Sequence, residues 1–177
     1  MTLREYLDSI KHKTVAVVGI GVSNEPLIRM LLGEGIAVTA CDKRTREQLG
    51  QLAGELEGLG ARLQLGPDYL EGLDQDVIFR TPGLRPDVPQ LAKAVAQGSE
   101  LTSEMEMFFR VCPCPIIAVT GSDGKTTTTT IIAELLKKAG NTVHVGGNIG
   151  HPLLCEAGEM RPTDYAVLEL SSFQLMT

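Results

Sequence analysis

Hydrophobic and polar positions in the first part of the chain alternate between runs typical of strands and runs typical of helices. Residues 14–18 read Thr-Val-Ala-Val-Val, an unbroken apolar and β-branched run that favours a strand buried on both faces of a parallel sheet. Apolar positions then share one face of a helix over residues 27–32, and the glycines that follow supply its stop signal. A second short strand over residues 37–41 ends at Asp42. This order predicts a β-α-β unit.

The same alternation continues through the first hundred residues. We expect a helix, two strands and a further helix, in that order, over residues 45–59, 62–65, 76–79 and 89–97. Thr81-Pro82-Gly83 is typical of a turn, because proline fixes φ and glycine tolerates positive φ. Strands that alternate with helices predict an α/β fold with an open, mostly parallel sheet.

A break in this pattern separates two expected domains, residues 1–111 and 112–177. A short helix is expected over residues 103–111, and Cys112-Pro113-Cys114-Pro115 then interrupts regular structure, because each proline disfavours a helical conformation in the residue before it. Beyond it the pattern starts again. We expect a strand over residues 116–119, then a glycine loop and a helix that ends near Ala139. Two further strands follow over residues 142–145 and 165–170, with a second glycine loop over residues 146–150 between them.

Composition and charge narrow the class of protein. The chain has 177 residues, 43% of them hydrophobic and 21% charged, which is ordinary for a globular protein and excludes a disordered chain, a collagen-like fibre or a coiled coil. The net charge of −6 disfavours non-specific binding to nucleic acid or to anionic membranes. No apolar run approaches the roughly 20 residues that span a bilayer, and the first residues lack the apolar core of a signal peptide. We therefore expect a cytoplasmic protein without membrane insertion or nucleic-acid partners.

The spacing of the four cysteines, Cys41, Cys112, Cys114 and Cys155, fits no zinc-binding template. We expect reduced, structural thiols.

The strongest chemical signal is the glycine loop between the strand at 116–119 and the next helix. Its residues 119–127 read Val-Thr-Gly-Ser-Asp-Gly-Lys-Thr-Thr, which is shorter than the strict phosphate-loop pattern, because Val119 stands where that pattern has its first glycine. Successive backbone N–H groups and the helix N-terminus can bind phosphate oxygens there. Lys125 can reach the β- and γ-phosphates, and the Thr126 hydroxyl can ligate Mg²⁺. The alternative is a tight turn with an ordinary exposed lysine.

An acidic residue downstream can complete a metal site. Glu169 ends the expected strand at 165–170, and the carboxyl ends of parallel strands form the edge at which α/β proteins bind ligands. The alternative is an edge carboxylate in solvent.

An earlier glycine loop, Gly19-Ile20-Gly21-Val22-Ser23-Asn24, is similar to the dinucleotide-binding fingerprint, with Asn24 in the place of the third glycine. Asp42 lies 23 residues after Gly19, near the spacing of a ribose-binding carboxylate. Two interpretations stay open on these residues alone: a nicotinamide-binding oxidoreductase domain, or glycines that only permit close packing of helix and sheet.

Taken together, these segments resemble the Mur ligases of peptidoglycan synthesis, and within them the type that adds D-glutamate to UDP-N-acetylmuramoyl-L-alanine. The segments that carry the resemblance follow the order of the family and span nearly the whole chain: residues 19–23, 81–83, 119–127, 146–150 and 168–175. Folylpolyglutamate synthases share the second loop but not the preceding domain, so they fit less well.

The resemblance implies a Rossmann-like UDP-binding domain followed by the first part of a P-loop ATPase domain of α/β class. It implies an ATP-dependent amide ligase in which a substrate carboxylate takes the γ-phosphoryl group of ATP, and the amine of D-glutamate attacks the resulting acyl phosphate. ATP and Mg²⁺ are the implied cofactors. UDP-N-acetylmuramoyl-L-alanine and D-glutamate are the implied partners, and the full-length enzyme is expected to be a monomer.

The resemblance also implies residue roles. The ATP loop comprises Gly121, Ser122, Asp123, Gly124, Lys125, Thr126 and Thr127. The implied metal ligands are Thr126 and Glu169, and the implied catalytic residues are Lys125, Asn148 and Glu169. The implied UDP contacts are Gly21, Val22, Ser23, Asp42, Lys43, Arg44, Thr81, Pro82 and Gly83.

The chain departs from the family pattern at several points. Asp123 stands where asparagine is usual, Lys43 where a small hydroxyl residue is common, and Asn24 where glycine is usual. Family members also continue well beyond residue 175, so we expect a fragment that binds the UDP-sugar, does not ligate alone, and can self-associate through an exposed sheet edge. A non-catalytic nucleotide-binding module and an NAD-dependent oxidoreductase domain are the alternatives.

Overall fold

A computed structural model describes residues 1–149 and 151–175 of the chain, which form two compact units. The first unit comprises Glu5–Glu104, and the second comprises Met1–Arg4 together with the residues from Met105 onward. The domain boundary expected after Val111 falls inside the second unit and stays a prediction.

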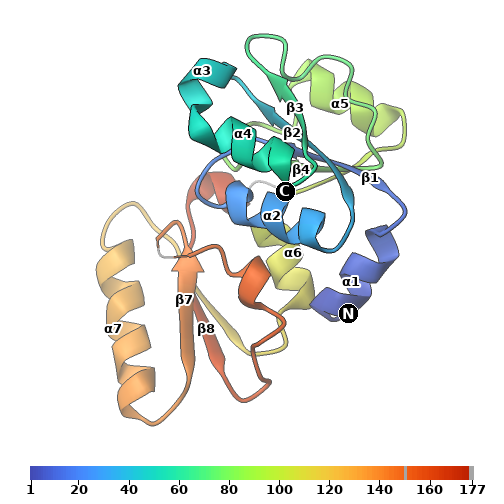
Figure 1. Ribbon diagram of the computed structural model, residues 1–177. Coiled ribbons are helices and arrows are strands. Elements are labelled where there is room, and N and C mark those ends of the chain that lie inside the picture. Colours follow the sequence, from blue (N-terminus) through green and yellow to red (C-terminus); the bar gives the residue numbers. More distant parts are fainter. Residues whose placement is uncertain (150, 176–177) are drawn as a thin grey trace. The chain divides into compact units, whose positions relative to one another are not determined.

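The first unit is built on a five-stranded parallel sheet in the order β3-β2-β1-β4-β5 (Figure 1). The strands are β1 (Thr14–Val18), β2 (Ala37–Asp42), β3 (Arg62–Leu65), β4 (Val77–Arg80) and β5 (Glu100–Thr102). The helices of this part of the chain are α1 (Leu3–Ile10), α2 (Asn24–Gly33), α3 (Arg46–Leu49), α4 (Gln51–Gly58) and α5 (Pro89–Ala96). The α/β class and the parallel sheet are confirmed.

Burial explains why β1 occupies the centre of this sheet. Val15, Ala16, Val17 and Val18 have no solvent-exposed surface, as expected for a strand covered on both faces. Helix α2 packs on β1 and β2, α4 packs on β3, and α5 packs on β5. From β1 the chain adds β2 and β3 toward one edge of the sheet, and β4 and β5 then lie on the other side of β1. This change of direction places the switch point of the sheet directly after Val18.

Two differences from the expected elements have local causes. The helix expected over 45–59 is divided at Gly50, whose φ of +59° is incompatible with a continuous helix. Thr45 caps the first half, accepting a hydrogen bond from the Gln48 backbone while the Gln48 side chain accepts from the Thr45 backbone. Helix α1 and strand β5 were not expected. Three residues are too few to show the period of β5, whereas the buried Leu3, Tyr6, Leu7 and Ile10 do follow a helical period that sequence reasoning missed.

The second unit carries a three-stranded parallel sheet in the order β6-β8-β7. Its strands are β6 (Ile116–Val119), β7 (Val143–Gly147) and β8 (Tyr165–Glu169). Its helices are α6 (Glu104–Val111) and α7 (Lys125–Lys138), with short 3-10 turns η1 (Leu154–Glu156) and η2 (Ser172–Leu175). Helix α7 packs along β7 and β8 (Figure 1).

Strand β7 extends into the segment 146–150, which the sequence predicted to be a loop. Gly146 and Gly147 pair with Leu168 and Glu169 of β8, so they belong to the sheet. Gly150, the last residue of that segment, lies outside the described residues. The register places Val119 and Gly147 on either side of Glu169, so one sheet edge collects the ends of all three strands.

Candidate functional site

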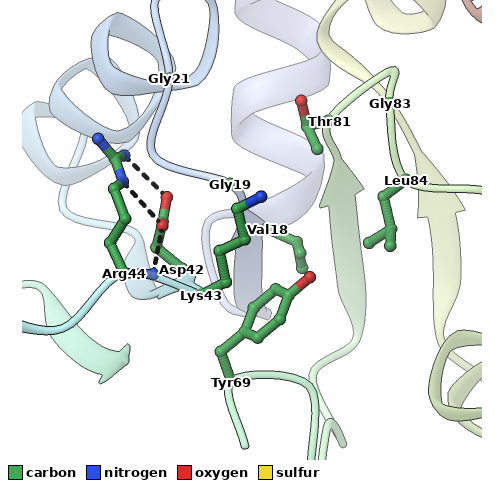
Figure 2. Close-up of a pocket in the computed structure, with 10 residues that line it drawn as sticks. All are labelled: Val18, Gly19, Gly21, Asp42, Lys43, Arg44, Tyr69, Thr81, Gly83 and Leu84. Atoms are coloured by element: carbon green, nitrogen blue, oxygen red, sulfur yellow. Dashed lines mark hydrogen bonds and ion pairs between the residues drawn. The ribbon is translucent and has the colours of Figure 1, made fainter. Parts of the chain in front are cut away.

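A cavity of about 460 Å³ opens at the carboxyl ends of β1, β2 and β4 in the first unit (Figure 2). It is lined by Val18, Gly19, Gly21, Asp42, Lys43, Arg44, Tyr69, Thr81, Gly83 and Leu84. Ligands of open α/β sheets bind at this edge and at this reversal of strand order.

Asp42 and Arg44 form the polar side of this cavity. One carboxylate oxygen of Asp42, Oδ2, accepts a hydrogen bond from the backbone N–H of Ile20 at 2.7 Å and pairs with Nη2 of Arg44 at 2.9 Å. The other, Oδ1, accepts from the backbone N–H and from Nε of Arg44, both at 2.9 Å. Burial alone would raise the pKa of Asp42, but the hydrogen bonds from Arg44 and Ile20 outweigh it and hold this pKa below its ordinary value. Asp42 therefore orients the guanidinium of Arg44, whose side chain is 41% exposed.

The first glycine loop has a tightly determined backbone. Gly19 has a φ of +88°, and a Cβ on it would lie 3.0 Å from the Thr81 side chain. Its N–H donates to the Cys41 carbonyl at 2.7 Å. Asn24 stands where the fingerprint has its third glycine, and its hydrogen bonds give a reason for the difference. Its side-chain Nδ2 donates to the carbonyls of Val18 and Gly19 at 3.1 and 3.0 Å. The buried Asn24 amide thus holds the turn that a third glycine would only permit.

The structure brings together part of the predicted UDP set. Gly21, Asp42, Lys43, Arg44, Thr81 and Gly83 line the cavity. Val22, Ser23 and Pro82 are not among the lining residues, and the Val22 side chain is 81% exposed. Sequence reasoning missed Tyr69 and Leu84. Tyr69 follows β3, so the rule that ligands gather at carboxyl ends of parallel strands could have indicated its loop.

The second glycine loop joins β6 to α7 in the second unit. Gly121 and Gly124 take φ values of +146° and +73°, which favour glycine, and α7 begins at Lys125. The Lys125 ammonium donates to the carbonyls of Gly121 at 2.8 Å and Ser122 at 3.1 Å. The lysine therefore lies folded over its own loop, and Asp123 is exposed to solvent.

Three predicted residues meet at the end of this loop. The Thr126 hydroxyl donates to Oε2 of Glu169 at 2.7 Å, and Nδ2 of Asn148 donates to Oε1 at 3.0 Å. The Asn148 backbone N–H also donates to the Glu169 carbonyl at 2.7 Å. The hydrogen bonds from Thr126 and Asn148 lower the pKa of Glu169, so its carboxylate is ionised at neutral pH.

Glu169 is 2% exposed, so the alternative of an edge carboxylate in solvent is wrong. The neighbouring Gly147 is required by close approach: its φ is +97°, and a Cβ on it would lie 2.2 Å from the Glu169 carbonyl oxygen. Over residues 1–149 and 151–175, no three His, Cys, Asp or Glu side chains gather as metal ligands.

Comparison with known proteins finds relatives among the Mur ligases. The model of the Mur ligase middle domain matches residues 119–177, the part of the chain that contains the second loop, Asn148 and Glu169. A UDP-N-acetylmuramoylalanine--D-glutamate ligase of Ruminiclostridium cellulolyticum is 56% identical over 176 residues, and one of Clostridium botulinum is 55% identical over 174 residues. Over nearly its whole length the chain is similar to Mur ligases.

These matches cover 99% and 98% of this chain and 38% of each relative, so the chain spans about two fifths of the length of the relatives it matches. A solved structure, the UDP-N-acetylmuramate:L-alanyl-gamma-D-glutamyl-meso-diaminopimelate ligase from Neisseria meningitides, superimposes with a TM-score of 0.51 at 20% identity. The superposition covers 89% of this chain and 52% of that one, and it supports the same fold.

In the described part of the chain, no helix is both long enough and apolar enough to cross a membrane.

Proposed function

We propose that the chain belongs to an ATP-dependent amide ligase that adds D-glutamate to UDP-N-acetylmuramoyl-L-alanine through an acyl phosphate. The observation that carries the proposal is the contact of Thr126 and Asn148 with the buried Glu169 at the end of a phosphate loop, in a chain similar to Mur ligases. The names of the relatives, which are D-glutamate ligases, support this choice within the family.

The first cavity is the proposed site of the UDP moiety. The backbone N–H groups of the first glycine loop and the N-terminus of α2 suit a diphosphate, and Lys43 and Arg44 add positive charge beside them. The proposed contacts are Gly21, Val22, Ser23, Asp42, Lys43, Arg44, Thr81, Pro82 and Gly83, with Asp42 acting through Arg44.

The second loop is the proposed site of ATP and Mg²⁺. The residues fit a magnesium ion, because Mg²⁺ prefers oxygen ligands, uses only one or two from the protein, and completes its shell with water and phosphate oxygens. The Thr126 hydroxyl and the ionised Glu169 carboxylate supply two such oxygens within 2.7 Å of each other. Bound there, Mg²⁺ would neutralise charge on the transferring phosphoryl group.

The residues of this loop would act by positioning. Gly121, Ser122, Asp123, Gly124 and Thr127 would surround the phosphates with backbone N–H groups. Lys125 would leave the two loop carbonyls and place its ammonium on the β- and γ-phosphates. Asn148 would hold Glu169 while the γ-phosphoryl group passes to the substrate carboxylate, and the amine of D-glutamate would then displace phosphate.

The test is isothermal titration of the chain with UDP-N-acetylmuramoyl-L-alanine, with MgATP and with NADH. We expect binding of the first two and none of NADH. Lys125→Ala and Glu169→Gln are expected to weaken MgATP binding and leave the UDP-sugar unaffected, whereas the matched control Lys138→Ala, at the far end of α7, changes neither. Binding of NADH in the first cavity, without binding of the UDP-sugar, contradicts the proposal.

We expect ligation only from the full-length protein, in which the same variants are compared by phosphate release. Loss of D-glutamate-dependent phosphate release in Lys125→Ala, with activity retained in Lys138→Ala, is the expected result. Unchanged release in Lys125→Ala would refute the assigned role of the loop.

A further inference from the structure

We propose that Tyr69 supplies the aromatic face against which the base of the bound nucleotide stacks, a contact that neither the glycine motif nor the family resemblance assigns. The inference rests on the proposed function, because it takes the first cavity to hold a uridine diphosphate. Tyr69 would then set affinity for the base half of the ligand, while Arg44 and the glycine loop bind the diphosphate half.

The cavity has two chemically different sides. Asp42, Lys43 and Arg44 form a polar side, whereas Tyr69 and Leu84 form an apolar side whose residues pack on the buried core beneath the sheet. Figure 2 shows the Tyr69 ring pointing into the space between Lys43 and Leu84. A nucleoside diphosphate has the same division, with a flat apolar base at one end and charged phosphates at the other. Matching the two halves places the base on the Tyr69 side.

The backbone around Tyr69 is held in place without a ligand. The N–H of Gly66 donates to the carbonyls of Asp42 at 2.9 Å and Arg44 at 3.1 Å, which ties the Tyr69 loop to the polar side of the cavity. The Gln64 side chain donates to the carbonyls of Tyr69 at 3.2 Å and Glu71 at 2.7 Å. A loop whose backbone is held in this way loses little conformational freedom when a base stacks on the Tyr69 ring.

The charge state of the ring also suits an anionic ligand. Burial raises the pKa of Tyr69, and the negative charge of Asp42 raises it further, so the phenol stays neutral at neutral pH and does not repel a diphosphate. A neutral phenol retains its aromatic face and its O–H donor.

The expected size of the effect follows from base stacking on aromatic side chains. Removing one stacked aromatic ring weakens binding by roughly 5- to 150-fold. Stacking tolerates any base, because every base has a π-face, so the loss should be similar for UDP and CDP. It should be absent for pyrophosphate, which has no base.

The experiment is calorimetric titration of the chain with UDP, CDP and pyrophosphate. Tyr69→Leu keeps an apolar side chain on the core but removes the ring, Tyr69→Phe keeps the ring, and Phe109→Ala, a 43% exposed aromatic residue in the second unit, is the control. We expect Tyr69→Leu to weaken UDP and CDP at least fivefold with pyrophosphate unchanged, and Tyr69→Phe and Phe109→Ala to bind UDP within about twofold of the parent.

The outcomes separate this inference from the proposal beneath it. If the parent chain does not bind UDP, the proposed UDP site fails and the inference fails with it. If the parent binds UDP and Tyr69→Leu binds it equally well, the UDP site stands and the stacking role is refuted. An equal loss for pyrophosphate and UDP also refutes it, because the ring would then act on the shape of the cavity and not on the base.

Discussion

Replacing Gly147 by alanine should loosen the end of the sheet that carries Glu169. Gly147 combines two restrictions: a φ of +97°, and a backbone so close to β8 that a Cβ would lie 2.2 Å from the Glu169 carbonyl oxygen. Gly140, just after α7, offers a matched control. Its φ is +89°, but a Cβ there meets nothing within 4 Å. The pair therefore separates backbone strain from steric overlap.

The free-energy costs of backbone strain and of steric overlap can be compared between the two variants. A left-handed conformation costs an alanine roughly 1–2 kcal/mol, and this cost applies to both variants. The overlap with Glu169 forces the strands apart and adds about 1–3 kcal/mol in Gly147→Ala alone. The entropy that alanine removes from the unfolded chain is common to both and cancels. We thus expect Gly147→Ala to be less stable than Gly140→Ala by about 1–3 kcal/mol.

Hydrogen exchange of the amides in β7 and β8 measures this difference directly. Exchange should be roughly 5- to 150-fold faster in Gly147→Ala than in Gly140→Ala, since each 1.4 kcal/mol is a factor of ten. The hydrogen bond from the Asn148 N–H to the Glu169 carbonyl should break in Gly147→Ala, so the Asn148 amide should lose its protection as well. Equal exchange in the two variants would show that β7 can move away from Glu169 without cost, and would refute the argument that close approach requires glycine at this position.

Three further outcomes are expected. Asn24→Ala removes the donor to two buried carbonyls and should lower the unfolding free energy by about 1–3 kcal/mol in urea titration, so a change below about 0.5 kcal/mol would contradict its role in the loop. The pKa of Asp42 is lowered in the folded state, so its pairing with Arg44 stabilises the fold in full above the ordinary carboxyl pKa, about 3.9, and this stabilisation is lost as pH falls through the folded-state value. The difference in unfolding free energy between the parent and Asp42→Asn should therefore become smaller from pH 5 to pH 3. A constant difference would contradict this reasoning. Burial raises the pKa of the Cys41 thiol to about 12, so iodoacetamide should modify the partly exposed Cys112 well before Cys41, and mass spectrometry showing the reverse order would argue against the buried position of β2.

The sequence pattern predicted the regular elements well because their signals are local. Residues 14–18 are uniformly apolar, and the structure confirms a strand buried on both sides. The break at Gly50 was missed, because a single glycine within a helical pattern indicates a less stable helix and does not by itself indicate that the helix ends. Strand β5 was missed because three residues are too few to show a period of two.

The two sites differ in how far the sequence could predict them. The contact of Thr126 with Glu169 joins residues 43 positions apart, yet it followed from placing Glu169 and the glycine loop before Thr126 at the carboxyl ends of parallel strands. Val22, Ser23 and Pro82 were included because they stand in segments that carry the family resemblance, but adjacent side chains in a loop point in different directions, and these three do not line the cavity. Tyr69 belongs to no motif, and only the fold brings it to the cavity.

The strand order of the second unit has a consequence for how this part of the chain is made. Strand β8 lies at the centre of the sheet but is the last of its three strands along the chain, and β6 and β7 each pair with β8 and not with each other. During synthesis, β6 and β7 leave the ribosome without a hydrogen-bonding partner and stay unpaired until residues 165–169 follow. Pairing over such sequence separations is slow and exposes unpaired strands in the meantime. The carboxylate that ends β8 is therefore placed later than the strands on either side of it, so these three strands and the candidate ligand site form in one step.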